Sequence, residues 1–241
     1  MKHIPFLIVA ILSAVGCSAP SQDESIGRSS DEIIGGHDAT ETYPFMVSTQ
    51  TSQGEHWCGG ALVAPQWVVT AQHCLRAISK VRIGSNSTES GGELIAIQRK
   101  IAHPSDDIAL LRLASASQST PVELASEDPA DDSPGRIIGW GTTSWPQTNY
   151  PIDLKELDIQ FRPVRACSGG EPGQGDICIS GTRTEGACHG DSGGPAISGS
   201  SGHWTLVGAT SRAGSGGECA GTSIYTGIAA HVQWIRSTIG G

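Results

Sequence analysis

A succession of short apolar runs, each closed by turn-forming residues, restricts the fold of this chain more than any other feature of its sequence. Gly, Pro, Asn and Ser separate the runs, and Gly alone accounts for 32 residues. The runs are residues 45–49, 60–63, 67–71, 80–83, 94–97 and 108–113 in the first half, and 135–141, 154–161, 177–179, 195–197 and 204–210 in the second. Runs of this kind are typical of antiparallel strands.

Residues 228–236 are the exception, because their apolar side chains recur three and four positions apart and predict a helix. A polar stretch between Ala114 and Pro134 separates the two strand-rich halves. We therefore predict an all-β protein with two packed six-stranded antiparallel barrels and a C-terminal α-helix. The first barrel is expected at about residues 33–126 and the second at about 127–241.

The N-terminus is typical of an exported protein. Residues 1–17 combine a short basic start with an apolar run at 4–15, as in a signal peptide. The run ends in Ala14-Val15-Gly16-Cys17, which resembles a bacterial lipobox and predicts lipidation of Cys17; an ordinary signal peptide that happens to contain a cysteine is the alternative. Residues 18–32 are polar and acidic and are expected to be a pro-segment or linker. We expect the protein to be secreted or membrane-anchored through Cys17.

The other six cysteines are scattered, without a Cys-x-x-Cys pair: Cys58, Cys74, Cys167, Cys178, Cys188 and Cys219. In an exported protein they indicate three disulfides, with 15 possible pairings, and no metal site. The formal charge is −9 and Lys and Arg form no cluster, which argues against nucleic-acid binding. We expect no cofactor and no metal, and a monomer.

Residues 188–195 place Ser192 among glycines, directly after Asp191. Such a turn is usually only a turn, because a serine hydroxyl needs a base and an orienting acid to become a nucleophile. His73 follows an apolar strand and precedes Cys74, and Asp107 enters another apolar strand. A core histidine and a strand-capping aspartate are the structural alternatives for these two residues.

Together these stretches resemble the chymotrypsin/trypsin family of serine endopeptidases. The resemblance runs from Ile33 to about Ile239. It covers the Ile-Ile-Gly-Gly start at Ile33, the turn at 57–60, Thr-Ala-x-His-Cys at His73, Asp-Ile-Ala-Leu at Asp107, Gly-Trp-Gly at 139–141 and Gly-Asp-Ser-Gly-Gly-Pro at Ser192. The order of histidine, aspartate and serine is also that of the family.

The resemblance implies Greek-key barrels and a catalytic triad. His73 would be the general base and acid, Asp107 its orienting partner and Ser192 the nucleophile, with the N–H groups of Gly190 and Ser192 as oxyanion hole. It also implies the disulfides Cys58–Cys74, Cys167–Cys178 and Cys188–Cys219. Protein or peptide substrates would be the partners.

The resemblance further implies activation by a cut before Ile33, after which the new α-amine pairs with Asp191. The residues before the cut are Asp31-Glu32, where a trypsin-like zymogen usually has a basic residue. We therefore expect an activating protease that accepts an acidic residue, trimming in two cuts, or activation by the protein itself.

Specificity would depend on the primary pocket, whose base in this family corresponds to Gly186. Without an aspartate there, a preference for Arg or Lys is not expected. The further substrate-binding residues would be His189, Ser211, Arg212, Ala213 and Ser223, which leave room for an apolar, small-to-medium residue. The cationic side chains of Arg212 and His189 offer an alternative, cleavage after Glu or Asp.

Two other functions are compatible with parts of the sequence. Gly-x-Ser-x-Gly at 190–194 also fits the nucleophile elbow of α/β-hydrolases, with Glu218 and His231 following in the required order. That elbow must open a helix, for which Gly193-Gly194-Pro195 is poorly suited, and alternating helices are missing. The second alternative is a protease fold that acts only as a binding protein, although such proteins typically lose a triad residue.

Overall fold

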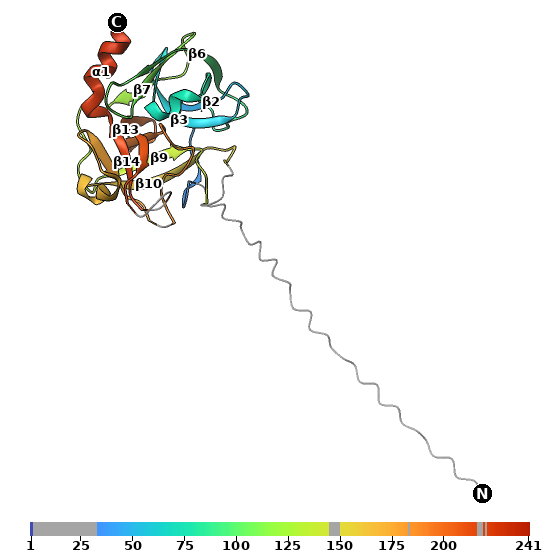
Figure 1. The fold of residues 1–241 in the computed structure, drawn as a ribbon. Helices are drawn as coiled ribbons and strands as arrows, with labels where there is room; N and C mark the ends of the chain where they lie inside the picture. Colours follow the sequence, from blue (N-terminus) through green and yellow to red (C-terminus); the bar gives the residue numbers. More distant parts are fainter. Residues whose placement is uncertain (2–32, 145–149, 183, 216–218, 220) are drawn as a thin grey trace.

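The computed structural model describes residues 1, 33–144, 150–182, 184–215, 219 and 221–241. Within this part of the chain the strands form two closed antiparallel barrels, one above the other in Figure 1. Cys17, the expected signal peptide apart from Met1, and the expected pro-segment at 18–32 lie outside the described residues.

Six strands close the first barrel in the order β2-β3-β4-β7-β6-β5. They are β2 (Met46–Gln50), β3 (His56–Ala64), β4 (Trp67–Thr70), β5 (Lys80–Ile83), β6 (Glu93–Ala102) and β7 (Ala109–Leu113). All six runs predicted in this half are strands. The turn expected at 57–60 is wrong, since these residues lie inside β3, where Gly60 pairs with Val47.

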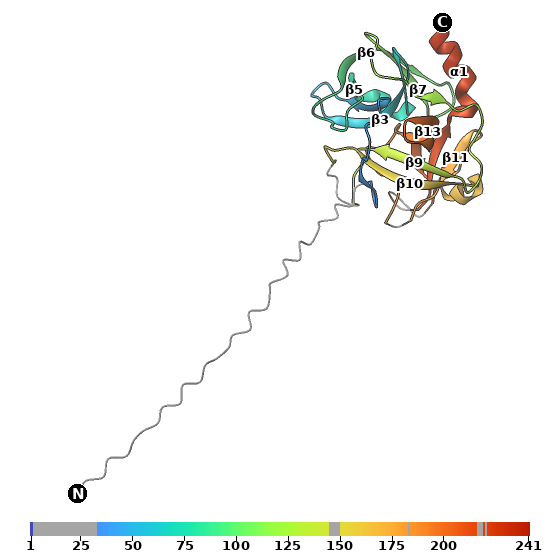
Figure 2. The ribbon, with the colours of Figure 1, turned by 180° about the vertical axis from the view of Figure 1, so that it is seen from behind.

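The second barrel closes as β9-β10-β11-β14-β13-β12, with β12 returning to β9. Its strands are β9 (Pro134–Gly139), β10 (Lys155–Arg162), β11 (Asp176–Ile179), β12 (Pro195–Ser200), β13 (His203–Ala213) and β14 (Ser223–Gly227). Two short strands, β1 (His37–Asp38) and β8 (Glu123–Leu124), add to β10 and β13. The view from behind in Figure 2 shows β9 and β10 side by side.

Strand β14 was missing from the sequence prediction, although all five of its residues are buried. Its sequence, Ser-Ile-Tyr-Thr-Gly, contains polar residues at Ser223 and Thr226, so it shows no apolar run. A strand in a closed barrel is hydrogen-bonded on both sides, which lets it keep buried hydroxyls without an apolar pattern.

Three helical segments complete the described part of the fold. They are η1 (Gln72–Arg76) after β4, η2 (Val164–Gly170) after β10 and the C-terminal helix α1 (Ile228–Gly240), which extends the predicted helix by one turn. Helix α1 leaves the second barrel at the end of β14 and runs beside the first (Figures 1 and 2). No helix in the described ranges is long and apolar enough to cross a membrane.

Candidate active site

His73 and Asp107 meet because their strands are neighbours. Strand β4 ends just before η1, which carries His73, and β7 begins just after Asp107; Thr70 pairs with Ala109 across the two strands. The Nδ1 atom of His73 lies 2.8 Å from Oδ2 of Asp107, and the backbone N–H of His73 donates to Oδ1 at 3.0 Å. Both carboxylate oxygens of Asp107 therefore contact nitrogens of His73, which fixes the position and the ring orientation of that residue.

The second barrel contributes a third donor to this carboxylate. The Oγ hydroxyl of Ser211, in β13, donates to Oδ2 of Asp107 at 2.7 Å. Burial alone would raise the pKa of Asp107, but the hydrogen bonds from His73 and Ser211 outweigh it and hold that pKa below its usual value. Asp107 is thus kept ionised. Ser211, which was predicted only as a pocket residue, is one of its hydrogen-bond donors.

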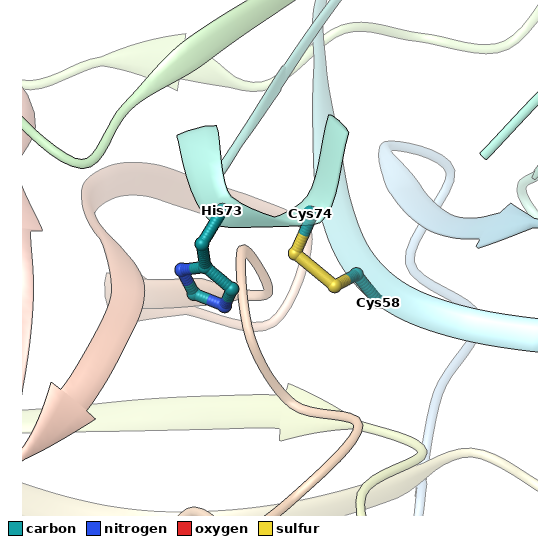
Figure 3. A group of neighbouring side chains, drawn as sticks. All are labelled: Cys58, His73 and Cys74. Carbon is teal, nitrogen blue, oxygen red and sulfur yellow. A yellow bond between two sulfur atoms is a disulfide. The ribbon is translucent and has the colours of Figure 1, made fainter. Parts of the chain in front are cut away.

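A disulfide anchors η1 to the first barrel. Cys74, next to His73, is bonded to Cys58 of β3, and Figure 3 shows the imidazole beside the two sulfur atoms. Because these sulfurs are bonded to each other, they offer no thiolate that could join His73 in binding a metal. Two other disulfides join Cys167 to Cys178 and Cys188 to Cys219. Cys188 is the first residue of the turn at 188–195, which we call the serine turn.

Glycines let the serine turn pack against the first barrel. A Cβ atom on Gly193 would lie 2.2 Å from Oγ1 of Thr70 and 2.6 Å from the backbone nitrogen of Ala71. The Gly59 N–H donates to the carbonyl of Ser192 at 2.8 Å. The turn therefore lies against the end of β4, immediately before His73, and places Ser192 there.

The backbone of the turn leaves two N–H groups available. Among the described residues, neither the N–H of Gly190 nor that of Ser192 has a hydrogen-bond partner. Gly190 adopts a φ of +96°, and a Cβ there would lie 2.7 Å from the ring of Tyr150. Only glycine fits this conformation and this contact.

Asp191 is buried, with 3% of its surface exposed. Its carboxylate accepts the N–H groups of Gly141 at 2.8 Å and Cys188 at 2.9 Å. Burial raises the pKa of Asp191 to about 6, and these two hydrogen bonds offset only part of the effect. A Cβ on Gly139 or Gly141 would lie within 2.2 Å of a carboxylate oxygen, which explains the Gly-Trp-Gly motif.

Sequence reasoning missed His56. Its Nε2 atom lies 3.1 Å from the carbonyl oxygen of Gly190, and Nδ1 lies 2.8 Å from Oγ of Ser48. Desolvation lowers the pKa of His56 to about 4, so the ring is neutral at pH 7 and its Nε2–H can donate to Gly190. Its position two residues before Cys58 places it near the site, but nothing in the local sequence indicates that its side chain reaches the serine turn.

A pocket of about 370 Å³ opens beside Ser192. Its walls include Ala187, Ala213, Thr222 and Ser223, and no carboxylate lines it within the described ranges. His189, Ser211 and Arg212 line it as well. Gly186 adjoins this pocket through its neighbour Ala187, and its own N–H donates to the carbonyl of Ile34 at 2.9 Å.

The guanidinium of Arg212 is already bound. It donates to Oδ2 of Asp176 at 2.7 Å, to Oγ of Ser211 at 3.1 Å, and to the carbonyls of Gly170 and Glu171, each at 3.0 Å. Its charge is therefore compensated by Asp176 before any substrate arrives.

The fold excludes the α/β-hydrolase alternative. Ser192 lies in a turn between antiparallel strands and not before a helix. His231 is in α1, where its Nε2 atom lies 2.9 Å from Oδ2 of Asp106. Glu218 lies outside the described residues.

Comparison with known proteins agrees with this geometry. The sequence profile of the Trypsin family matches residues 33–235. The chain is 31% identical to trypsin alpha of Drosophila melanogaster over 99% of this chain and 97% of the relative, and 33% identical to anionic trypsin of Canis lupus familiaris over 98% of each. Among solved structures it resembles neuropsin, a serine protease expressed in the limbic system of mouse brain, with a TM-score of 0.71, 30% identity, and coverage of 81% of this chain and 94% of that one.

Proposed function

This chain belongs to the trypsin family and is a serine endopeptidase, and from that premise we propose how its residues carry out the reaction. Ser192 attacks the scissile carbonyl while Nε2 of His73 takes the hydroxyl proton. The N–H groups of Gly190 and Ser192 stabilise the oxyanion, and His73 then passes the proton to the leaving amine. Water hydrolyses the acyl-enzyme by the same steps, again with His73 as the base.

The observation that carries this assignment is the orientation of His73 by Asp107. Because Nδ1 of His73 lies 2.8 Å from an ionised carboxylate, Nδ1 keeps its proton and Nε2 is left as the base. The unpaired N–H groups of Gly190 and Ser192 support the oxyanion hole, where one such donor is worth about 3 kcal/mol of the barrier.

Labelling with a fluorophosphonate tests the assignment. We expect one adduct on a peptide containing Ser192, complete loss of labelling in Ser192→Ala, and labelling slowed at least a hundredfold in His73→Ala. Both variants should unfold at the wild-type temperature. Equal labelling of wild type and His73→Ala would exclude His73 as the base.

We further propose that a cut before Ile33 activates the enzyme through the new α-amine and Asp191. Two features of the uncut chain support this. Ile33 is fully buried with a φ of +44°, a conformation that a β-branched residue rarely adopts, and Asp191 has no ion-pair partner among the described residues. Cutting the peptide bond before Ile33 removes the steric restriction on its φ. The same cut creates the positively charged α-amine of Ile33. N-terminal sequencing of the active enzyme should begin at Ile33, and any other start excludes the pairing.

For specificity, we propose cleavage after apolar, small-to-medium residues. The uncharged walls at Ala213 and Ser223 support this, and the bond from Arg212 to Asp176 disfavours the acidic alternative. A peptide library varied at the residue before the scissile bond tests it, with Asp176→Asn as a matched variant. We expect the wild type to prefer Ala, Val or Leu, and the variant to gain cleavage after Glu because the positive charge of Arg212 is then no longer compensated by Asp176. A wild type that prefers Glu would refute the proposal.

Export with lipidation of Cys17 is a further proposal, which rests on residues 1–17 alone. Mass spectrometry of the exported protein should find an N-terminus at Cys17 that carries a diacylglycerol thioether. An unmodified Cys17 in the exported protein would contradict lipidation, and Cys17→Ser is the control.

A further inference from the structure

Two histidines and an aspartate converge behind the triad, at the junction of α1 with the first barrel. His103 directly follows β6, Asp106 precedes Asp107, and His231 projects from α1. One donor atom from each lies within 4.8 Å of the other two. The carboxylates of Asp106 and Asp107 point to different partners, so this cluster is separate from the triad.

The hydrogen bonds around His231 fix its tautomer. Its Nδ1 atom lies 2.7 Å from the carbonyl oxygen of Gly227, which can only accept, so Nδ1 carries a proton. In the neutral ring Nε2 then presents a lone pair, and it faces Oδ2 of Asp106 at 2.9 Å. Histidines that bind metals characteristically donate their other ring N–H to a carbonyl in this way.

A second ring nitrogen lies near the same oxygen. Nδ1 of His103 is 3.1 Å from Oδ2 of Asp106, and its lone pair accepts the backbone N–H of Asp106 at 3.1 Å. That hydrogen bond has to open before Nδ1 can bind an ion. A divalent cation at the centre would then be bound by all three donor atoms.

The donor set and its setting fit a zinc-class ion. Two imidazole nitrogens and one carboxylate oxygen, with a fourth position left for water, form a common zinc site, whereas calcium and magnesium prefer oxygen. Donors around tetrahedral zinc lie about 3.3 Å apart, so the contacts to Asp106 need to open by only a few tenths of an ångström. Asp106 is 38% exposed, which gives an ion access from solvent, while His231 is 5% exposed.

We propose that His103, Asp106 and His231 form a binding site for a zinc-class divalent ion that joins α1 to the loop before Asp107. The hydroxyl of Thr226, at the end of β14, already donates to the carbonyl of Asp107 at 3.1 Å. The ion adds a second connection between the same two regions. No local motif predicts this site, because His231 lies 125 positions after Asp106.

The test is calorimetric titration of zinc chloride into the full-length protein carrying Ser192→Ala, which prevents self-digestion. We expect one ion per chain and, at a hundredfold excess over the dissociation constant, a rise in the unfolding temperature of about 5 °C or more. Asp106→Asn keeps the shape of the side chain and should weaken binding at least tenfold, as should His231→Gln.

Two controls separate this site from others. His203→Ala removes an exposed histidine elsewhere and should leave binding unchanged, and His73→Ala should also keep it. Saturable binding that survives Asp106→Asn but is lost in His73→Ala would place the ion on the catalytic histidine and overturn the proposal. No saturable binding below millimolar zinc would overturn it as well, and the cluster would then be an imidazolium–carboxylate pair.

Discussion

The proposed dependence of activation on the buried carboxylate of Asp191 can be measured as a difference in the free energy of unfolding between two forms of the protein. One form keeps residues 18–32 and the other begins at Ile33, and both carry Ser192→Ala. In the uncut form burial raises the pKa of Asp191 from 3.8 to about 6. Ionising this group in the folded protein therefore costs about 3 kcal/mol at pH 7.5.

The sign of the pH dependence follows from that raised pKa. A carboxyl whose pKa is higher in the folded state loses stability as the pH rises through that value, so the cost falls to about 1 kcal/mol at pH 4.5. In the cut form the proposed pairing of the α-amine with Asp191 would remove this cost. The stability difference between the two forms should thus narrow by about 2 kcal/mol between pH 7.5 and 4.5. Relief of the φ of Ile33 should add about 1–3 kcal/mol at both pH values.

Urea unfolding of both forms at the two pH values measures the difference. Acetylation of the α-amine of Ile33 is the matched control, since it keeps the cut but removes the charge. The acetylated protein should lose the pH-dependent part of the stability difference and keep the part that comes from the φ of Ile33. Changes at His56, which titrates in both forms, cancel in the difference. The pairing with Asp191 would be refuted if the difference in unfolding free energy between the cut and uncut forms were the same at both pH values, or if acetylation left that difference unchanged.

Three further predictions concern residues around the site. Ser211→Ala removes a hydrogen bond to the carboxylate of Asp107, worth about 2 kcal/mol, and should lower kcat/KM for a peptide ester more than tenfold without changing KM; an unchanged kcat would show that the bond does not matter. His56→Leu leaves the carbonyl of Gly190 without its donor and should lower kcat. Because burial lowers the pKa of His56 to about 4, the wild type should lose about 3 kcal/mol of stability as the pH falls from 6.5 towards 4, and the variant should lack this loss in urea unfolding. Gly186→Asp should shift cleavage towards Arg and Lys in a peptide library, at a cost in unfolding temperature because φ is +148°, and Gly186→Ala should show the cost without the shift.

The sequence predicts the strands of the first barrel well because their apolar runs are continuous. Gly, Pro, Asn and Ser lie in the segments between them, and all six were identified. Strand β14 was missed for the opposite reason, since a hydrogen-bonded barrel strand can bury Ser223 and Thr226 without an apolar pattern. An apolar pattern in the sequence indicates which side chains are buried. In a closed barrel, that burial depends on packing against strands that are distant in the chain.

The contacts that cross between the barrels could not be predicted. His73, Asp107 and Ser192 were predicted because each stands in a local motif. His56 and Ser211 each act on a partner more than 100 positions away, and no local motif marks either contact. The pairing of Arg212 with Asp176 is of the same kind, and it changes the expected chemistry of the pocket because a cation assumed to be available is already bound.

These long-range contacts imply that the site exists only while the two barrels are packed together. The first barrel supplies His73 and Asp107, and the second supplies Ser192 and the third donor, Ser211. The serine turn presents its backbone to the first barrel: the Gly59 N–H donates to the carbonyl of Ser192, and a Cβ on Gly59 would lie 2.6 Å from Cα of Gly194. Since backbone-to-backbone contact of this closeness requires glycine on both sides, the glycines of the serine turn matter as much for joining the barrels as for turning the chain. A substitution on either side of this contact should therefore displace Ser192 before it unfolds either barrel.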